Sequence, residues 1–343
     1  MSWLPPSGGS VPPGRLLRMR FSHTRLLSAL CWGALLTNLL AWYVIRQADD
    51  WSLATLLSYG PRWIWLLPPL ALAPAAYFPS FRWSRGVPLA WAAFIAAVPI
   101  LQYEFGRFTS PDEQGNVIKV VSMNAASKGD PAALRVVLDR ERPEIVVIQE
   151  WLQPKKPLAL SGYSVLCQEG LCVVSPYPME SAGVLDRRDI GGWNLMAALT
   201  KVTTPQGDIM IGNVHLDTPR EGIEAVQRRE SDAVEELQSN IVSRGLESRL
   251  VSKWLAGVRG PMLIAGDFNL PADSAIYRKH WTRWADAFDV AGWGYGWTKY
   301  TSWWGVRIDH ILFDPAHWEA IEARVGDDIG SDHRPVVARV RRR

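Results

Sequence analysis

Residues 1–110 of this chain contain no lysine and only three acidic residues, Asp49, Asp50 and Glu104. Nine arginines make this part basic, so the formal net charge of +3 for all 343 residues arises here. The other 28 basic and 31 acidic residues lie in 111–343, which therefore has no basic excess. Because proteins that bind nucleic acid in a groove usually have a basic surface, this absence weakens a nucleic-acid interpretation, although a local basic patch would still permit it. The chain also shows no internal repeat and no low-complexity tract, and its length suits about two domains.

Charge is also missing from residues 26–45, an apolar stretch of about 20 residues, which is the length that crosses a bilayer core of about 30 Å. Further apolar stretches follow at 61–78 and 87–105, with tryptophan and tyrosine near their ends, where interfacial aromatics are common. We expect about three transmembrane helices in an anchor of residues 1–110, and an odd number of crossings. Prolines interrupt the second stretch, so a re-entrant hairpin is its alternative. A cleaved signal peptide is disfavoured, because the first apolar core is too long and no small-residue cleavage site follows it.

Arginines are distributed unevenly around these stretches. Arg15, Arg18, Arg20 and Arg25 precede the first stretch, and Arg82 and Arg85 lie between the second and the third. Since positive residues favour the cytoplasmic side, the N-terminus and this second loop are predicted to be cytoplasmic. We therefore predict a multi-pass protein of the cell membrane with residues 111–343 on the extracytoplasmic side, in contact with membrane lipids and with no obligate protein partner.

Two of the three cysteines fit an external domain. Cys167 and Cys172 bracket four residues and could form a disulfide across a short hairpin. Disulfides persist in oxidising compartments. Two buried free thiols are the alternative.

Residues 111–343 alternate short apolar runs with helix and turn signals. We expect strands at 117–123, 144–148, 171–175, 196–202, 209–215, 261–265, 308–313 and 336–340. Asp130 and Pro131 predict the start of a helix that extends to about Arg140. One or two further helices, broken near Gly245, are expected within 220–257. This mixture predicts an α/β sandwich with a largely antiparallel core.

Acids, amides and imidazoles recur where the predicted strands end. They are Asn124, Gln149 and Glu150, Asn213 to Asp217, Gly266 to Asn269, Arg307 to His310 and Gly330 to Pro335. Buried strands that end in carboxylates are costly, because an unpaired buried charge is strongly penalised. A shared metal or phosphate site would explain all of them. Each motif alone fits an ordinary turn, cap or core histidine, so the specificity lies in their order and combination.

That ordered set resembles the endonuclease/exonuclease/phosphatase superfamily, which includes deoxyribonuclease I-like nucleases, abasic endonucleases, inositol polyphosphate phosphatases and neutral sphingomyelinases. The matching stretches are SMN at 122–124, IQE at 148–150, NVHLD at 213–217, GDFN at 266–269, RIDHIL at 307–312 and GSDHRP at 330–335. The resemblance implies a four-layer α/β sandwich of two mainly antiparallel sheets flanked by helices, with 111–343 as the catalytic domain.

The resemblance also implies a metal site. Glu150 would be the principal metal carboxylate, assisted by Asn124, and Asp332 a further metal or water ligand. Oxygen ligands suit Mg²⁺, with Mn²⁺ as an alternative.

The catalytic roles follow in the same way. His333 would activate the attacking water or contact the phosphate, and Asp309 would bond the other ring nitrogen of His333. Asp267 would orient the nucleophile or protonate the leaving oxygen, with Asn269 positioning it. His215 and Asn269 would donate hydrogen bonds to phosphate oxygens. The resemblance does not decide whether Asp267 or His333 is the general base.

One departure bears on the branch of the family. Ala126 stands two positions after Asn124, where abasic endonucleases carry an acid, and this argues against the DNA-repair branch.

The Trp-rich segment 292–304 has two interpretations. It is either a loop that packs on the core or a rim that stacks on substrate bases or enters lipid headgroups.

We predict a membrane-attached, Mg²⁺-dependent phosphodiesterase or phosphatase acting on a lipid headgroup, a small phosphoester or nucleic acid. The weak acidity of 111–343 and the membrane anchor favour the first two substrates, whereas the family as a whole favours a nuclease. A catalytically silent membrane scaffold is the alternative from another class. It is disfavoured because Glu150, Asp267, Asn269, Asp309 and His333 are all present.

Overall fold

The computed structural model describes residues 14–77, 82–106, 116–127, 130–151, 160–301 and 303–343. Contacts divide the chain into two compact units. The helical unit comprises Met1–Trp42 and Trp63–Pro99, and the sandwich unit comprises Tyr43–Arg62 and Ile100–Arg343. The segment Tyr43–Arg62, which lies within the anchor predicted from the sequence, therefore packs with the sandwich unit.

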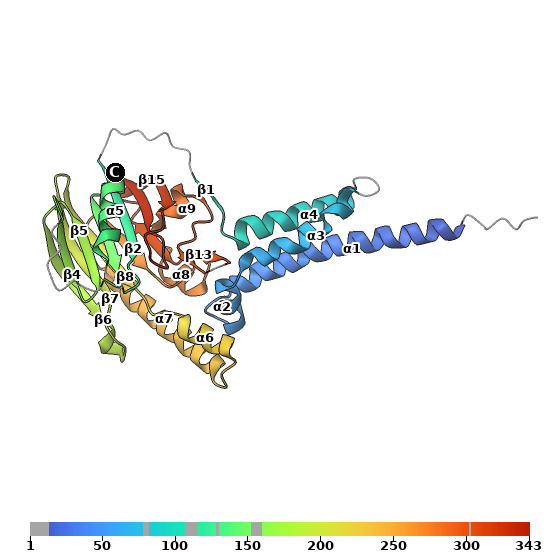
Figure 1. The fold of residues 1–343 in the computed structure, drawn as a ribbon, viewed down its shortest axis with the longest axis horizontal. Coiled ribbons are helices and arrows are strands. Elements are labelled where there is room, and N and C mark those ends of the chain that lie inside the picture. The colour runs from blue at the N-terminus through green and yellow to red at the C-terminus, as the bar shows by residue number, and fades with distance from the viewer. Residues whose placement is uncertain (1–13, 78–81, 107–115, 128–129, 152–159, 302) are drawn as a thin grey trace, which may run out of the picture. The chain divides into compact units, whose positions relative to one another are not determined.

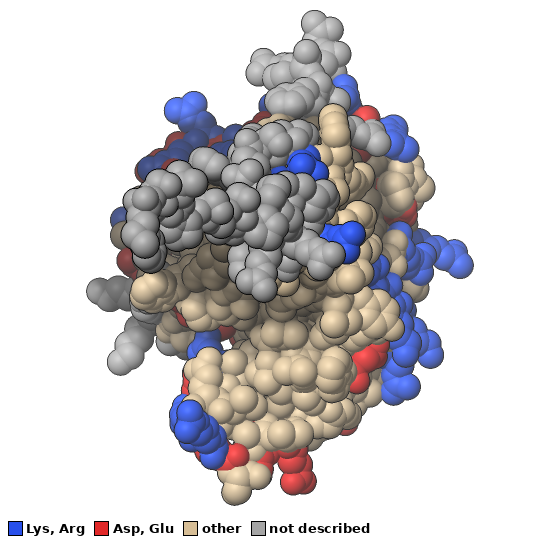
Figure 2. Space-filling model, turned by 90° about the vertical axis from the view of Figure 1, so that its right-hand side faces the viewer, with Lys and Arg blue, Asp and Glu red and all other residues tan. Residues whose placement is uncertain are grey.

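The helical unit consists mainly of three helices, α1 (Gly14–Ile45), α3 (Leu67–Tyr77) and α4 (Trp83–Ile95), the last of which continues as a π-helical turn to Ile100. A 3₁₀ helix, η1 (Arg62–Leu66), precedes α3. Asn38 is fully buried in α1 and donates from Nδ2 to the carbonyls of Trp65 (3.0 Å) and Ala92 (2.9 Å). This single amide connects α1 with η1 and α4. Figure 2, which faces the side of the N-terminal helices, shows broad areas without charged side chains.

Two helices are long and apolar enough to cross a membrane, His23–Ile45 and Trp83–Ile100. Length and composition alone are weak evidence, since a soluble core helix or a signal sequence meets the same criteria. The third span expected at 61–78 is not supported, because prolines divide this stretch into the 3₁₀ helix and a helix of only 11 residues. The range expected for the last span, 87–105, extends beyond the helix, which ends at Ile100. Its last residues, Glu104–Phe105, form strand β1, which pairs with β11 (Trp293–Gly294) in the sandwich unit.

Two six-stranded sheets form the sandwich unit, in the orders β15-β16-β2-β3-β5-β4 and β10-β14-β9-β8-β7-β6. Only β2 with β3 and β8 with β9 are parallel among the strand pairs of these two sheets. The first sheet contains β2 (Val117–Asn124), β3 (Ile145–Gln149), β4 (Ser164–Gln168), β5 (Leu171–Ser175), β15 (Trp318–Val325) and β16 (Val336–Arg342). The second contains β6 (Met179–Asp186), β7 (Leu195–Thr204), β8 (Gly207–His215), β9 (Met262–Asp267), β10 (Ala285–Asp286) and β14 (Asp309–Phe313). The expected pair of mainly antiparallel sheets is confirmed.

Helices flank the sheets (Figure 1). They are α2 (Ser52–Tyr59), α5 (Pro131–Glu141), α6 (Arg220–Arg228), α7 (Ala233–Ala256), α8 (Ala275–His280) and α9 (Ala287–Ala291), with a 3₁₀ helix η3 (Arg187–Ile190) after β6. Apolar residues such as Val120 and Ile211 fill the space between the sheets. Leu134 and Val137 of α5 pack on the first sheet, and Leu237 and Ile241 of α7 pack on the second. The resulting order is helix, sheet, sheet, helix.

The helix signals in the sequence were partly correct. Asp130 caps α5, accepting a bond from the Ala132 amide (2.8 Å), and Pro131 is the first helical residue. The break expected near Gly245 is wrong, because α7 continues through that position. The break lies after α6, where Arg229 takes a left-handed conformation with φ of 58°. A conformation of that kind ends a helix at any residue that adopts it.

Cys167 and Cys172 lie directly opposite each other in the β4–β5 hairpin and form a disulfide, with their Cα atoms 4.1 Å apart. A second small antiparallel pair joins β12 (Lys299–Tyr300), inside the Trp-rich segment, with β13 (Gly305–Val306), directly after it. Tyr295 and Trp297 in that segment stack on each other at 5.3 Å, and Tyr103 contacts Trp293 edge-on at 5.9 Å. Part of the segment therefore packs through aromatic contacts, whereas Trp293 and Trp303 are largely exposed, so the choice between a packed loop and a substrate rim stays a prediction.

Candidate active site

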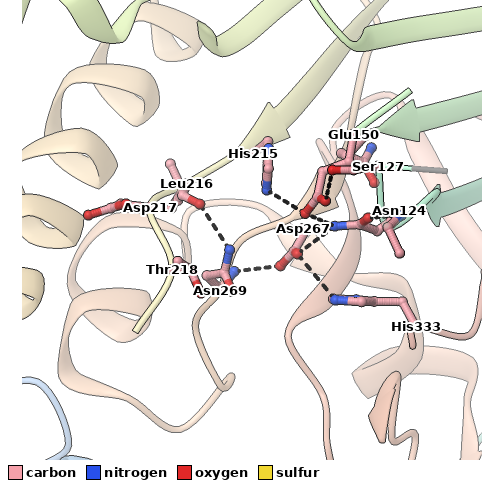
Figure 3. Close-up of polar contacts among 12 residues, drawn as sticks. Asn124, Ser127, Glu150, His215, Leu216, Asp217, Thr218, Asp267, Asn269 and His333 are labelled. Atoms are coloured by element: carbon pink, nitrogen blue, oxygen red, sulfur yellow. Dashed lines mark hydrogen bonds and ion pairs between the residues drawn. The ribbon is translucent and has the colours of Figure 1, made fainter. Parts of the chain in front are cut away.

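The two parallel strand pairs bring four polar side chains to one end of the sandwich. Asn124 is in register with Gln149, which precedes Glu150, and His215 is in register with Asp267. Parallel neighbours end at the same edge of a sheet, so each pair delivers two side chains to that edge. Figure 3 shows these side chains pointing toward one another across the two sheets.

A glycine allows strands β8 and β9 to approach each other closely at the site. Gly266 has φ of 155°, and a Cβ atom there would lie 1.9 Å from the carbonyl oxygen of Val214 on the neighbouring strand. Only glycine permits this approach. The first residue of the GDFN motif thus serves the spacing of β8 and β9, which sets His215 beside Asp267.

Asn124 connects the two carboxylates of the site. Its Nδ2 donates to Glu150 Oε1 (2.9 Å) and to Asp267 Oδ2 (3.0 Å), and its own Oδ1 accepts the Ala126 amide (2.8 Å). Ser127 Oγ donates to the second oxygen of Glu150 (2.8 Å). The nearby His215 first, and then Asn124, hold the pKa of Glu150 below its ordinary value despite the opposing effect of burial. Glu150 is therefore ionised at neutral pH.

His333 stands between two buried carboxylates. Its Nδ1 lies 2.9 Å from Asp309 Oδ2, and its Nε2 lies 3.7 Å from Asp267 Oδ2. Burial favours the neutral ring, but Asp309 and then Asp267 outweigh burial and raise the pKa of His333 to about 9. Burial, followed by repulsion from Asp309, raises the pKa of Asp267. An acid and an imidazole with displaced pKa values in one cleft are typical of proton-transfer sites.

Asn269 is fixed by three bonds beside this pair. Its amide donates to Asp267 Oδ1 (2.9 Å), its Nδ2 donates to the Leu216 carbonyl (2.9 Å), and its carbonyl accepts from Tyr59 Oη (2.6 Å). The residue has φ of 50°, a left-handed conformation that asparagine tolerates. These bonds hold the turn after β9 in one conformation.

His215 faces Glu150, with Nε2 3.5 Å from Oε1. Its backbone carbonyl accepts from Arg187 Nη2 (2.7 Å), and Arg187 is in turn paired with Glu247 of α7. Glu247 also accepts the amide of Asp217 (2.7 Å). A buried ion pair thus supports the end of β8.

Asp332 lies at the margin of the cluster. Its carboxylate pairs with Lys299, and Arg220 is 3.7 Å away. Its second oxygen is 4.0 Å from His333 Nε2. Burial would raise the pKa of Asp332, but Lys299 lowers it below its ordinary value. The structure therefore brings seven of the eight predicted site residues together and sets Asp332 beside two cations, where its predicted role as a ligand stays a prediction.

The cluster suits a divalent cation. Glu150, His215 and Asp267 offer ligand atoms within 4.8 Å of one another, and so do Asp267, Asp309 and His333. Asp309 Oδ1 is buried and has no hydrogen-bond partner. Buried carboxylates this close together repel unless positive charge compensates them. The carboxylate oxygens are donors that suit a hard divalent cation such as Mg²⁺ or Mn²⁺, whereas an imidazole is a more usual ligand of softer ions.

A cavity of about 460 Å³ opens beside these groups. It is lined by the polar residues Glu150, His215, Asp267, Asn269 and His333 and by the apolar side chains of Tyr59, Leu216, Ile223, Trp304, Val306 and Ile308, among others. A cavity of this size holds a small molecule or one part of a larger one. Trp304 thus forms part of the cavity wall, whereas Trp303 is largely exposed.

Sequence reasoning missed Tyr59, Arg187, Lys299 and Glu247. None lies in the six stretches that match the family, although Lys299 stands in the Trp-rich segment, and each acts through a partner that is distant in the sequence, such as Arg187 with Glu247, 60 residues away. The only available signal was weak, namely that Tyr59 precedes Gly60 and Pro61 in a short polar interruption between apolar stretches.

The Endonuclease/Exonuclease/phosphatase family model matches residues 121–333. No curated protein matches the chain in sequence. The 3′ phosphatase NExo from Neisseria, solved with a product DNA hairpin, is 18% identical, covers 64% of this chain and 98% of its own, and gives a TM-score of 0.49. Truncated TDP2 from Caenorhabditis elegans (16% identity, 66% and 98% covered, TM-score 0.48) and the human Nocturnin catalytic domain with bound sulfate (14%, 66% and 95%, 0.45) are also similar. The family match begins within β2 and includes every site residue from Asn124 to His333.

Proposed function

Because the chain belongs to the Endonuclease/Exonuclease/phosphatase family, we propose that it is a divalent-cation-dependent phosphoester hydrolase attached to a membrane. The observation that carries the proposal is the cluster of Glu150, Asp267, Asp309 and His333 at one end of the sandwich, beside a cavity large enough for a phosphoester. The acids and the imidazole of this cluster are close enough to act on one phosphate.

Each side chain of the cluster has its own proposed role in hydrolysis. Asp309 accepts the Nδ1 proton of His333 and so leaves Nε2 facing Asp267 and the cavity. A water held between Nε2 and the Asp267 carboxylate would be oriented for in-line attack on phosphorus and would lose its proton to this pair. His215 Nε2 and the Asn269 side chain border the cavity and would donate to phosphate oxygens as their charge grows.

Mg²⁺ would be held by Glu150 with Asn124, and it would supply neutralising positive charge to the phosphate and the leaving oxygen. Asn124 uses its Nδ2 to fix Glu150 and Asp267 relative to each other. The hydroxyl of Ser331 donates to the Asn124 carbonyl (2.8 Å) and accepts the His333 amide (3.1 Å), so it connects the two halves of the site.

The proposed membrane attachment rests on the helical unit. Only 33% and 39% of the two apolar windows is buried, whereas the core helix of a soluble protein is mostly buried. Leu36 and Leu40 on α1 are each 63% exposed. Contiguous apolar surface of this kind is costly in water and is matched by lipid.

The proposed topology follows from the division into units. The chain leaves the sandwich unit after Arg62 and returns to it at Ile100. Because both ends of this segment lie in the sandwich unit, the segment would enter and leave a membrane on the same side. Since α3 is too short to span a bilayer, α3 and α4 would form a re-entrant hairpin, and α1 would supply the one complete crossing. The arginines in the first part of α1, which precede its apolar stretch, would then put the N-terminus in the cytoplasm and the sandwich unit outside.

A compact phosphoester, such as a lipid headgroup or a small diester, is the substrate we favour. Apolar side chains, among them Ile223, Trp304 and Val306, line much of the cavity. Of the cations that the structure shows in its lining, Arg220 and Lys299 are paired with Asp332, and Arg187 is paired with Glu247. A nucleic-acid strand would need several unpaired cations along its path. A nuclease remains the second candidate, because residues 121–333 match a family that contains nucleases.

A substrate panel tests the proposal. The full chain, purified in detergent, is offered sphingomyelin, phosphoinositides, bis(p-nitrophenyl) phosphate, DNA and RNA with Mg²⁺. The full chain is needed because Tyr43–Arg62 packs with the sandwich unit. We expect hydrolysis of a compact phosphoester that stops with EDTA; preferential cleavage of DNA or RNA would favour the second candidate, and no hydrolysis of any substrate would contradict both.

A further inference from the structure

The segment Tyr43–Arg62 is held in the sandwich unit by two buried ion pairs. Asp49 and Arg244 of α7 lie 2.9 Å apart, and both side chains are fully buried. Arg62 bonds both oxygens of Asp273 (2.8 and 3.0 Å). The two pairs therefore fix the start and the end of α2 against the sandwich unit.

The last residue of α2 reaches the active site. Tyr59 Oη donates to the Asn269 carbonyl (2.6 Å) and accepts from Arg244 Nη1 (2.9 Å). The backbone carbonyl of Tyr59 accepts from Trp304 Nε1 (3.0 Å). Both Tyr59 and Trp304 line the cavity. One residue thus contacts the turn after β9 and the loop between β12 and β13.

The hydroxyl of Tyr59 is suited to this work at any ordinary pH. Burial raises the pKa of Tyr59, which keeps the proton on the hydroxyl and available to the Asn269 carbonyl. Asn269 is the residue whose amide bonds Asp267 Oδ1. A bond at the carbonyl of a left-handed residue restrains the turn that sets both Asn269 and Asp267.

We infer that Tyr59, carried by the segment between the N-terminal helices, is a positioning residue of the active site and forms part of the wall of its substrate cavity. It acts through Asn269 on the Asp267 carboxylate, and through its ring on the space that receives the substrate. The catalytic site is thereby incomplete without a part of the chain that lies outside the matched residues 121–333. The expected effects on kcat and KM rest on the proposed function, whereas the restraint of the turn at Asn269 by Tyr59 does not.

Two substitutions separate the two roles. Tyr59→Phe removes the hydroxyl and keeps the ring, so we expect kcat to fall about 10-fold with KM changed less than about twofold. Arg244 Nη1, which is 3.4 Å from the Asn269 carbonyl, keeps the loss moderate. Tyr59→Ala also opens the wall, so KM should rise as well. Tyr163→Phe is the matched control, because Tyr163 Oη likewise donates to a backbone carbonyl, that of Pro143 (3.0 Å), away from the cavity.

Hydrogen–deuterium exchange of the full chain in detergent gives a readout that needs no turnover. In Tyr59→Phe, exchange should rise in the peptide covering 267–271 and stay at the wild-type level in the peptides of β2 and β7, and Tyr163→Phe should leave the 267–271 peptide unchanged. Unchanged exchange at 267–271, or an unchanged kcat in an active enzyme, would overturn the inference. Were the wild-type chain to hydrolyse no phosphoester, the proposed function would fail and the exchange result alone would decide the structural part.

Discussion

His333 Nδ1 lies 2.9 Å from Asp309 Oδ2, and both side chains are almost completely buried. The bond fixes the orientation of the ring and directs Nε2 toward Asp267 and the cavity. The same carboxylate is the main reason that the pKa of His333 is high. Asp309 thus controls both the geometry and the protonation of His333.

Replacing Asp309 should therefore damage catalysis more than folding. We expect Asp309→Asn to lower kcat by about 10²–10⁴-fold, the usual contribution of a positioned acid–base pair. Asp314→Asn is a matched control, because Asp314, directly after β14, pairs with His317 at 3.2 Å and both side chains are partly exposed. Steady-state kinetics of both variants measure the difference. Equal losses in the two variants would show that the Asp309–His333 pair has no special part in turnover.

Glu150 should govern the cation requirement. We expect Glu150→Gln to raise the Mg²⁺ concentration for half-maximal activity by at least about 10-fold, because a carboxylate ligand is lost. Glu144→Gln is the control. Glu144 lies directly before β3, whereas Glu150 lies directly after it, and Glu144 accepts the Lys119 amide (2.7 Å). Mg²⁺ titrations of the EDTA-treated enzyme give both values. An unchanged requirement in Glu150→Gln would remove Glu150 from the cation site.

The raised pKa of His333 has a consequence for stability. Folding raises this pKa from 6.5 to about 9, so the folded chain binds the proton more tightly than the unfolded chain. The resulting stabilisation is complete below pH 6.5 and is lost as the pH rises through 9. In EDTA, we expect the difference in Tm between wild type and His333→Gln to be largest near pH 6 and to shrink by pH 9.5. A difference that grows with pH would reverse the sign and contradict this account.

The polar site was predictable because its residues end strands. The sequence placed Asn124, Glu150, His215 and Asp267 at strand ends, and the family resemblance implied that they share one site. The two parallel pairings that bring Asn124 beside Glu150 and His215 beside Asp267 are seen only in the structure. The sheets were predictable for a similar reason, since their apolar runs are short and are bounded by turn signals.

Contacts between distant segments could not be predicted in this way. Tyr59 meets Asn269 across 210 residues, and nothing local in the sequence specifies that contact. Hydropathy alone also joined Glu104 and Phe105 to the preceding helix, although strand pairing with β11 determines their conformation. The helix break was set at Gly245 by propensity, but tertiary packing in α7 overrides propensity there.

The membrane topology yields a separate prediction. A periplasmic-type reporter enzyme fused after Asp50 and another fused after Arg343 should report the same side, because both positions belong to the sandwich unit. With a cytoplasmic N-terminus, both fusions should be active only outside the cytoplasm. Opposite results for the two fusions would contradict the hairpin formed by α3 and α4, and two cytoplasmic results would reverse the orientation.

We propose that the cluster around Asp267 hydrolyses phosphoesters with a divalent cation. The most direct measurement is the release of p-nitrophenol from bis(p-nitrophenyl) phosphate by the full chain and by Asp267→Asn, each with Mg²⁺ and with EDTA. We predict turnover by the wild-type chain with Mg²⁺, its loss in EDTA with recovery on adding Mg²⁺, and a fall of at least about 100-fold in Asp267→Asn. Turnover that survives both chelation and the substitution would contradict the account.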